Sequence, residues 1–271
     1  VLAGVRRRGA GMLARAECPI AASDRGQLPA RPPEGLQDAV RAVLGELRPV
    51  PSPHVAVLLP HEAARLALFE FDKLPRKAQD LRKEVEERFR NSLRLDLRAA
   101  RIALRAQRGG GRPSVLAVAA ASEYVRGCEE AFAAAGLRPG YVGSSCAAAL
   151  NLVREPAMSL LLMQGGQAMT LAAVEAGTVR LLRHVALPNA AGADEASAVQ
   201  EVLADVFPTL VYIEESFGRG VAHLLVAGFG QLQAALLAAL PQELASLASP
   251  LLANESASAR CGAGLMGYVH G

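Results

Sequence analysis

One stretch, Leu160–His184, constrains the fold of this chain more than any other. Its sequence is LLLMQGGQAMTLAAVEAGTVRLLRH, in which three apolar runs are separated by Gly165-Gly166 and by EAGT at 175–178. Short apolar runs bounded by glycine turns predict three consecutive strands in a meander. A glycine turn between strands is also typical of a loop that cradles phosphate, because glycine lets backbone N–H groups approach the ligand. The stretch therefore predicts either a plain hairpin turn or a phosphate-binding turn.

Length and composition favour an α/β protein with one large domain or two lobes. The chain has 271 residues, of which 51% are hydrophobic, so a sizeable core is available. A net charge of +3, a 4% share of aromatic residues and the lack of tryptophan argue against a base-stacking nucleic-acid surface. No uninterrupted apolar run reaches the length of about 18 residues that a bilayer span requires. No long apolar segment follows Arg6–Arg8, so a signal peptide is not expected either.

Metal-binding and catalytic motifs are not found in the sequence. The cysteines and histidines are widely spaced, at Cys18, Cys128, Cys146, Cys261, His54, His61, His184, His223 and His270. No spacing matches a zinc knuckle or HExxH, which predicts no metal site and reduced thiols in a cytoplasmic protein. Ser145 follows a glycine-serine pair but lies outside any GxSxG motif, and no histidine or aspartate partner is identified, so no catalytic residue is assigned.

Strands and helices occur in two successive sets, at roughly 54–153 and 158–252. Each set has hairpins or a meander followed by a helix, which predicts two α/β lobes around a cleft. Three prolines at 49, 51 and 53 mark the first boundary. Within the first set, acidic and basic residues alternate at helical spacing over Arg76–Leu93, as on a solvated helix face.

Three stretches, in this order along the chain, resemble the actin-like fold. They are Val115–Val153, Leu161–Pro188 and His223–Leu240. Within that fold they are similar to the type IV pilus assembly family PilM and its cell-division relative FtsA. The resemblance spans roughly 36–268. It implies an α/β, actin-like (FtsA/PilM-type) two-lobed fold with an inserted subdomain.

The resemblance also implies how the chain divides. Residues 1–50 would form the N-terminal part of the first lobe, with the upstream phosphate strand preceding Val1. Residues 51–153 would form the inserted FtsA/PilM-type subdomain. Residues 154–271 would form the second lobe, with the last helix returning to the first.

By the same resemblance, the chain carries two turns that hold a nucleotide in actin-like ATPases. The phosphate-like turn comprises Gly165, Gly166, Gln167 and Thr170, and the adenosine-like turn comprises Gly228, Phe229 and Gly230. The family's aspartate falls on Met163, whose thioether is not an oxygen ligand of the kind Mg²⁺ requires. Phe229 replaces the middle glycine of the second turn, where its ring could fill the space of a purine. These departures predict a degenerate ATPase-type site without a cofactor, with ATP binding as the alternative.

The resemblance implies a cytoplasmic scaffold at the inner membrane, in a type IV pilus or type II secretion machine; the cytoplasmic part of the secretion protein GspL is a relative. The expected partner is the cytoplasmic tail of a PilN-like inner-membrane protein, with the assembly motor ATPase as a second candidate. The tail would add to an open strand edge among His54–Leu59, Ala64–Phe71 and Ala99–Ala106. Contact with the membrane would then occur only through the partner. The alternatives are an active actin-like ATPase or sugar-kinase-like phosphotransferase, and a structural α/β domain with an unknown partner.

Overall fold

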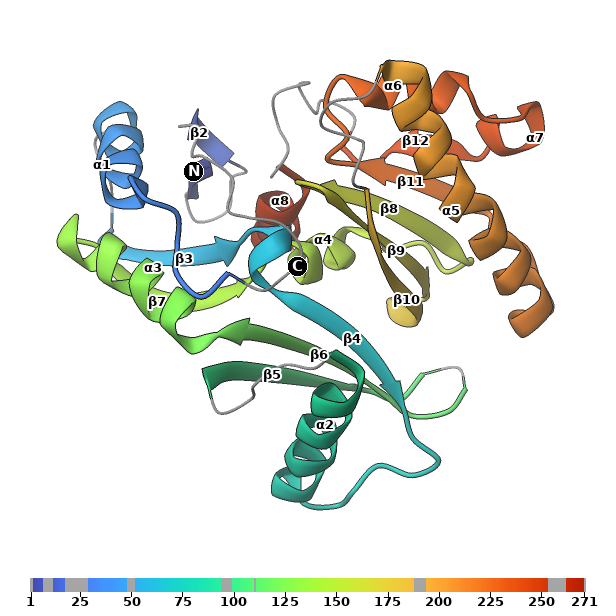
Figure 1. Ribbon diagram of the computed structural model, residues 1–271, viewed down its shortest axis with the longest axis horizontal. Helices are drawn as coiled ribbons and strands as arrows, with labels where there is room; N and C mark the ends of the chain where they lie inside the picture. The colour runs from blue at the N-terminus through green and yellow to red at the C-terminus, as the bar shows by residue number, and fades with distance from the viewer. Residues whose placement is uncertain are drawn as a thin grey trace.

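The structure of the chain is a computed structural model that describes residues 2–6, 12–17, 29–47, 52–93, 99–109, 111–187, 194–252 and 262–270. The strands are β1 (Leu2–Arg6), β2 (Met12–Glu17), β3 (His54–Leu59), β4 (Arg65–Glu70), β5 (Ala100–Gln107), β6 (Ser114–Ala121), β7 (Arg138–Ser144), β8 (Ser159–Gly165), β9 (Ala168–Glu175), β10 (Thr178–Ala186), β11 (His223–Ala227) and β12 (Ala248–Pro250). The helices are α1 (Leu36–Glu46), α2 (Ala78–Leu93), α3 (Ser122–Ala134), α4 (Ser145–Ala149), α5 (Glu195–Phe217), α6 (Leu232–Ala238), α7 (Gln242–Ala245) and α8 (Gly262–His270), with short 3₁₀ turns η1 (His61–Ala63) and η3 (Leu150–Leu152). Figure 1 shows how these elements are arranged in space.

The largest sheet has the strand order β10-β9-β8-β11-β12. Its first three strands form an antiparallel meander, which confirms the prediction for Leu160–His184. Gly166 and Gly177 lie at its two turns with φ of 59° and 73°, a backbone conformation that glycine adopts without steric cost. Strands β8, β11 and β12 run parallel, and α5 makes the crossover between the meander and β11.

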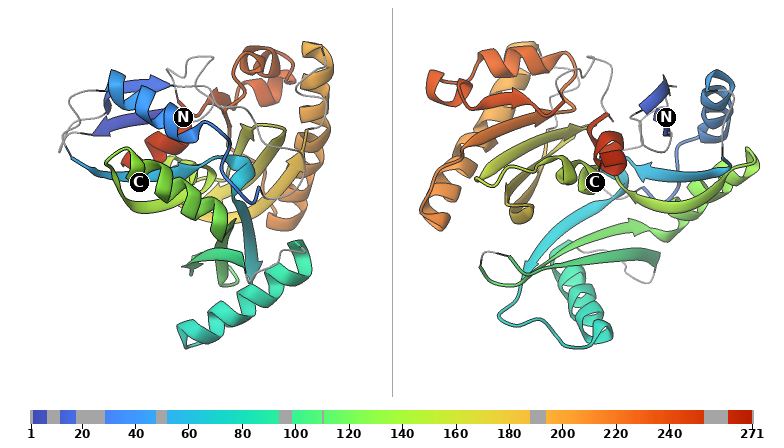
Figure 2. Two further views of the ribbon diagram at one scale, coloured as in Figure 1. Left: turned by 60° about the vertical axis from the view of Figure 1, so that its left-hand side comes forward. Right: turned by 180° about the vertical axis from the view of Figure 1, so that it is seen from behind.

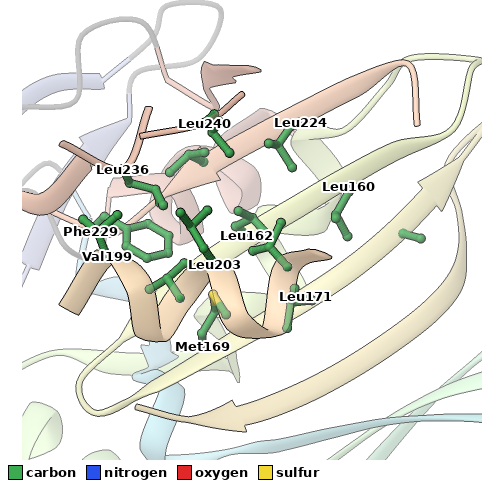
Figure 3. Packing of buried hydrophobic residues seen from close by; sticks show 14 of the residues in the cluster. Leu160, Leu162, Met169, Leu171, Val199, Leu203, Leu224, Phe229, Leu236 and Leu240 are labelled. Carbon is green, nitrogen blue, oxygen red and sulfur yellow. The ribbon is translucent and has the colours of Figure 1, made fainter. Parts of the chain in front are cut away.

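Helix α5 covers one face of this sheet. It begins after Asp194, whose carboxylate accepts a hydrogen bond from the Ser197 N–H, and it ends at Gly218 with φ of 67°. Its inner face packs on the core shown in Figure 3. Among the described residues, α5 alone is long and apolar enough to cross a bilayer, by length and composition only. One such helix is weak evidence for a membrane span.

The three-stranded sheet, of order β4-β6-β5, is antiparallel and is covered on one face by α2. Phe89 and Val85 of α2 are fully buried against this sheet, while its outer face carries ion pairs such as Arg82–Glu86. The amphipathic, charged helix predicted at Arg76–Leu93 is therefore confirmed, beginning at Ala78.

Strand β3 is not part of that sheet, although it precedes β4 closely in the sequence. It pairs in parallel with β7, so the three strands proposed as edges for a partner lie in two different sheets. Strands β1 and β2 pair antiparallel. The division at 51 and 153 stays a prediction.

One contact ties the three-stranded sheet to β10 and another packs α8 on α4; Figure 2 shows these elements from two further sides. The buried Gln107 side chain at the end of β5 accepts a hydrogen bond from the Val179 N–H at 3.0 Å and donates to the Val179 carbonyl at 3.3 Å, which ties the three-stranded sheet to β10. Helix α8 lies against α4 so closely that a Cβ on Gly267 would clash with the Ala148 carbonyl oxygen. The last described helix thus packs on the chain segment that follows β7.

Candidate functional site

The phosphate-like and adenosine-like turns lie side by side. Strands β8 and β11 are parallel neighbours with Met163 opposite Ala227, so both turns leave the sheet at the carboxyl ends of their strands. Gly228 has φ of 79°, and a Cβ at this position would clash with the Gln164 carbonyl oxygen. Ligand sites of open α/β sheets form at this edge, outside the carboxyl ends of the strands.

The first turn is occupied by the protein's own η1 segment. Gly165 pairs with Ala168, which leaves Gly166 and Gln167 as a two-residue turn. A Cβ on Gly165 would clash with the His61 side chain, and a Cβ on Gly166 would clash with the Glu62 carboxylate. The two glycines are therefore needed for close approach by η1, whatever else the turn does. An acidic side chain therefore lies over Gly166, within the turn predicted to be phosphate-like.

Met163, the position at which the resemblance predicts the family's aspartate to fall, has a side chain that belongs to the core. It is 3% exposed and packs in an apolar cluster with Cys146, Leu161 and Ala227. An ionised carboxylate in these surroundings would lose its hydration without gaining a charged partner. Position 163 thus lies in an apolar environment that does not suit Mg²⁺, and the Met163 thioether is not an oxygen ligand for it. Among the described residues, no three histidine, cysteine, aspartate or glutamate side chains are grouped to hold a metal ion.

Thr170, the last residue of the predicted phosphate turn, is the centre of a partly buried chain of polar side chains. Its Oγ1 lies 2.6 Å from His61 Nε2 and 3.2 Å from His184 Nδ1, and the two imidazole rings are stacked with centroids 5.1 Å apart. Arg65 Nη1 lies 3.4 Å from His184 Nε2. These residues come from η1, β9, β10 and β4, so the chain of hydrogen bonds connects the three-stranded sheet to the five-stranded sheet.

The direction of these hydrogen bonds follows from the chemistry of their ends. A guanidinium only donates, so His184 Nε2 accepts and the neutral ring carries its proton on Nδ1. That N–H donates to Thr170 Oγ1, and the Thr170 hydroxyl donates to His61 Nε2. His61 then keeps its proton on Nδ1, a buried atom without a hydrogen-bond partner among the described residues. The hydroxyl of Thr170 is fully used inside the protein.

Both histidines are held neutral by their surroundings. Burial, together with the charges of His184 and Arg65, lowers the pKa of His61 from 6.5 to about 3. Burial and the nearby Arg65 charge lower the pKa of His184 to about 4, although His184 as a whole residue is exposed. Burial lowers the pKa of Arg65 and raises that of Cys146, which is hydrogen-bonded to Thr170, to about 12. The cluster is therefore arranged for neutral imidazoles beside a cation.

The second turn is built around a core side chain. Phe229 is 3% exposed, and Figure 3 shows its ring between Val199 of α5 and Leu236 of α6. The ring thus anchors the turn to the core of the five-stranded sheet. Gly230 follows with φ of 58° and leads into α6. The adenosine-like character of this turn stays a prediction.

Sequence analysis missed four residues that surround the phosphate-like turn: His61, Glu62, Arg65 and His184. They are separated from Thr170 by up to 109 positions in the chain, so no local spacing links them. The one available signal was HEA at 61–63, a polar pair between two strand-like runs. The two cysteines within the described residues, Cys128 and Cys146, are free and buried.

Comparisons with known proteins find likenesses in structure only. No family model matches the sequence, and no curated protein matches it. Among solved structures, the chain is similar to a PilM–PilN type IV pilus biogenesis complex, with 17% identity, a TM-score of 0.69, and coverage of 95% of this chain and 92% of that one. It is also similar to the cytoplasmic domain of EpsL, an inner-membrane component of the type II secretion system of Vibrio cholerae, with 12% identity, a TM-score of 0.52, and coverage of 97% and 87%.

A third similar structure is a Bacteroides thetaiotaomicron protein of unknown function with an actin-like ATPase fold. It has 9% identity and a TM-score of 0.53, and the match covers 94% of this chain and 86% of that one. At such identities the likenesses establish the fold and nothing finer. The chain has a mixed α/β structure of the actin-like ATPase fold, as predicted.

Proposed function

We propose that this protein is a scaffold of a type IV pilus or type II secretion machine that binds the cytoplasmic tail of an inner-membrane partner. The observation that carries the proposal is the likeness to the PilM–PilN complex along 95% of the chain. The likeness to the cytoplasmic domain of EpsL supports the same class of role. The protein would lie on the cytoplasmic side of the inner membrane and be held there by its partner.

The phosphate-like turn supports a scaffold rather than the alternative of an active ATPase. Phosphoryl transfer depends on a metal ion and on charges placed around the phosphates. Here Met163 is a core residue, the Glu62 carboxylate lies over Gly166, and the Thr170 hydroxyl is engaged with two histidines. A γ-phosphate would have to displace η1 and approach the Glu62 carboxylate.

We expect Mg²⁺-ATP neither to bind nor to be hydrolysed. A ligand present at 100 times its Kd would stabilise the fold by about 2.7 kcal/mol, which a thermal unfolding scan detects as a higher melting temperature. Because we expect no binding, the scan with millimolar Mg²⁺-ATP should show no shift. The Glu62→Ala variant removes the carboxylate from the turn and separates two causes. A shift seen only in this variant means that the Glu62 carboxylate excludes the nucleotide. A shift in the wild-type protein, with steady phosphate release, would restore the ATPase alternative.

The open edge of β5 is the surface we assign to the tail. Strand β5 pairs with β6 on one side, and no described strand pairs with its other edge. Its outward residues Arg101, Ala103 and Arg105 alternate with the buried Ile102, which is typical of an edge that faces water on one side. An extended peptide added here would gain main-chain hydrogen bonds along the strand. The edge of β4 is less open, since β4 lies against β10. Strand β3, like β5, pairs on one side only among the described strands, but it is shorter than β5, at six residues against eight.

A tail peptide bound as an added strand should show a period of two in its backbone requirements. Along an edge strand, alternate N–H groups point toward the neighbouring strand and the others point away. We expect a peptide of the PilN-like tail from the same organism to bind. A single N-methyl group should weaken binding by about tenfold or more at alternate positions of the peptide, because one ladder hydrogen bond is lost there, and should have little effect at the positions between them. Calorimetric titration with a series of singly methylated peptides measures this.

The location is tested separately by hydrogen exchange. Binding should slow exchange of the β5 amides, while the amides of β12, at the far edge of the five-stranded sheet, serve as the internal control. A methylation series without periodicity would exclude strand addition. Protection confined to another sheet would move the site. If the peptide does not bind at all, the scaffold proposal in its present form is wrong.

A further inference from the structure

Helix α5 exposes a group of large apolar side chains on the outside of the molecule. Five large hydrophobic residues are exposed within the described part of the chain, and three of them lie on α5: Phe207 at 38%, Val211 at 55% and Tyr212 at 51%. Their spacing of four and five positions puts them on one face of the helix, opposite the buried Val206 and Ile213. Figures 1 and 2 show α5 running along the outer side of the five-stranded sheet. We call this group the α5 outer face.

A proline in the same region leaves a backbone acceptor open. Pro208 lies inside the helix and has no N–H, so the Ala204 carbonyl cannot receive its normal helical hydrogen bond. Ala204 is exposed and lies one turn before Pro208, next to Phe207. The neighbouring Asp205 carbonyl accepts the Thr209 hydroxyl at 2.6 Å. The α5 outer face therefore combines apolar side chains with a carbonyl that can accept a hydrogen bond from a partner.

The charges of α5 are all of one sign. The helix contains five acidic residues and no lysine or arginine: Glu195, Glu201, Asp205, Glu214 and Glu215. Asp205 is paired with Arg183 at 3.4 Å, and the nearest arginine after the helix, Arg219, binds Glu175. No ion pair formed by the described residues neutralises Glu214 or Glu215. Both lie in the last turn, where the helix dipole is itself negative and acidic side chains are unfavourable.

This pattern identifies the kind of occupant. We propose that the α5 outer face docks a cationic amphipathic helix of a protein partner. The occupant's apolar stripe would cover Phe207, Val211 and Tyr212, and its basic residues would neutralise Glu214 and Glu215. Aromatic side chains of this kind are the usual anchors of interfaces. A second copy of α5 would bring like charges together, and anionic lipid would be repelled by the same glutamates. This surface lies on a different sheet from β5, so it is independent of the tail-binding edge.

The test uses a defined probe. The probe is a fluorescein-labelled helix of about 18 residues with leucines at i, i+3, i+4 and i+7 and lysines elsewhere, long enough to form a helix on binding. We expect it to bind the full protein, and binding to fall with added salt, as measured by fluorescence anisotropy. The double variant Val211→Ser with Tyr212→Ser should weaken binding by about tenfold or more. The double variant Glu214→Gln with Glu215→Gln should weaken it several-fold and flatten its dependence on salt.

Two controls make the outcome decisive. Tyr141→Ser removes an aromatic residue of similar exposure, 47%, from β7 and should leave binding unchanged. A matched leucine/glutamate helix should not bind. The proposal is overturned if the cationic helix does not bind, or if the α5 variants bind it as the wild-type protein does. It is also overturned if the α5 variants instead abolish formation of a dimer, because the surface then binds a second copy of the chain. The same holds if they abolish binding to vesicles of phosphatidylglycerol and phosphatidylcholine, because the surface then binds lipid.

Discussion

Replacing Gly228 with alanine is expected to destabilise the protein by about 2–5 kcal/mol. Gly228 has φ of 79°, which costs an alanine about 1–2 kcal/mol of backbone strain. The added Cβ would also clash with the Gln164 carbonyl oxygen, a backbone atom that can move only if β8 and β11 separate. Overpacking of this kind costs about 1–3 kcal/mol more. Chemical unfolding monitored by circular dichroism measures the change in the free energy of unfolding.

Gly218→Ala is the matched control for this substitution. Gly218, at the end of α5, has a similar φ of 67°, but nothing lies within 4 Å of the position its Cβ would take. It should therefore cost only the backbone strain, about 1–2 kcal/mol. Equal losses in the two variants would mean that the close approach of the two turns does not contribute to stability.

Acidification is expected to destabilise the protein below pH 6.5 through His61. The pKa of His61 is about 3 in the folded protein, against 6.5 without burial, so the unfolded chain binds more protons between these values. The free energy of unfolding therefore falls as the pH falls from 6.5 toward 3. At pH 5 this single group would remove about 2 kcal/mol of the stability present at pH 7. His184 acts in the same direction, since its pKa is also lowered.

The variant His61→Gln tests the assignment. Glutamine can still accept the Thr170 hydroxyl but cannot be protonated in this range, so its stability should fall less between pH 7 and pH 5 than that of the wild-type protein. His54→Gln, at an exposed position of β3, is the control and should keep the wild-type pH dependence. Urea unfolding of the wild-type protein and of the two variants at the two pH values supplies the six free energies needed. A wild-type slope in His61→Gln would show that this buried imidazole is not the acid-sensitive group.

Much of the secondary structure could be predicted because it depends on short-range patterns. The meander of Leu160–His184 follows from apolar runs separated by glycine turns, and α2 follows from its charge spacing. The length of α5 is likewise marked by a capping Asp194 and by Gly218. The actin-like fold was predicted from the order of three stretches, since order and spacing persist where individual residues change.

The sequence by itself also determined what the phosphate-like turn lacks, because no arrangement of the chain can make Met163 a carboxylate. Only the tertiary structure decided what lies over that turn. His61 and Glu62 reach Gly165 and Gly166 because η1, β4, β9 and β10 meet in space. The chain of hydrogen bonds through Thr170 forms for the same reason. A pattern in the sequence reports which side of a local element is apolar. It does not report which distant segment will pack there, since that depends on shape and burial across the whole chain.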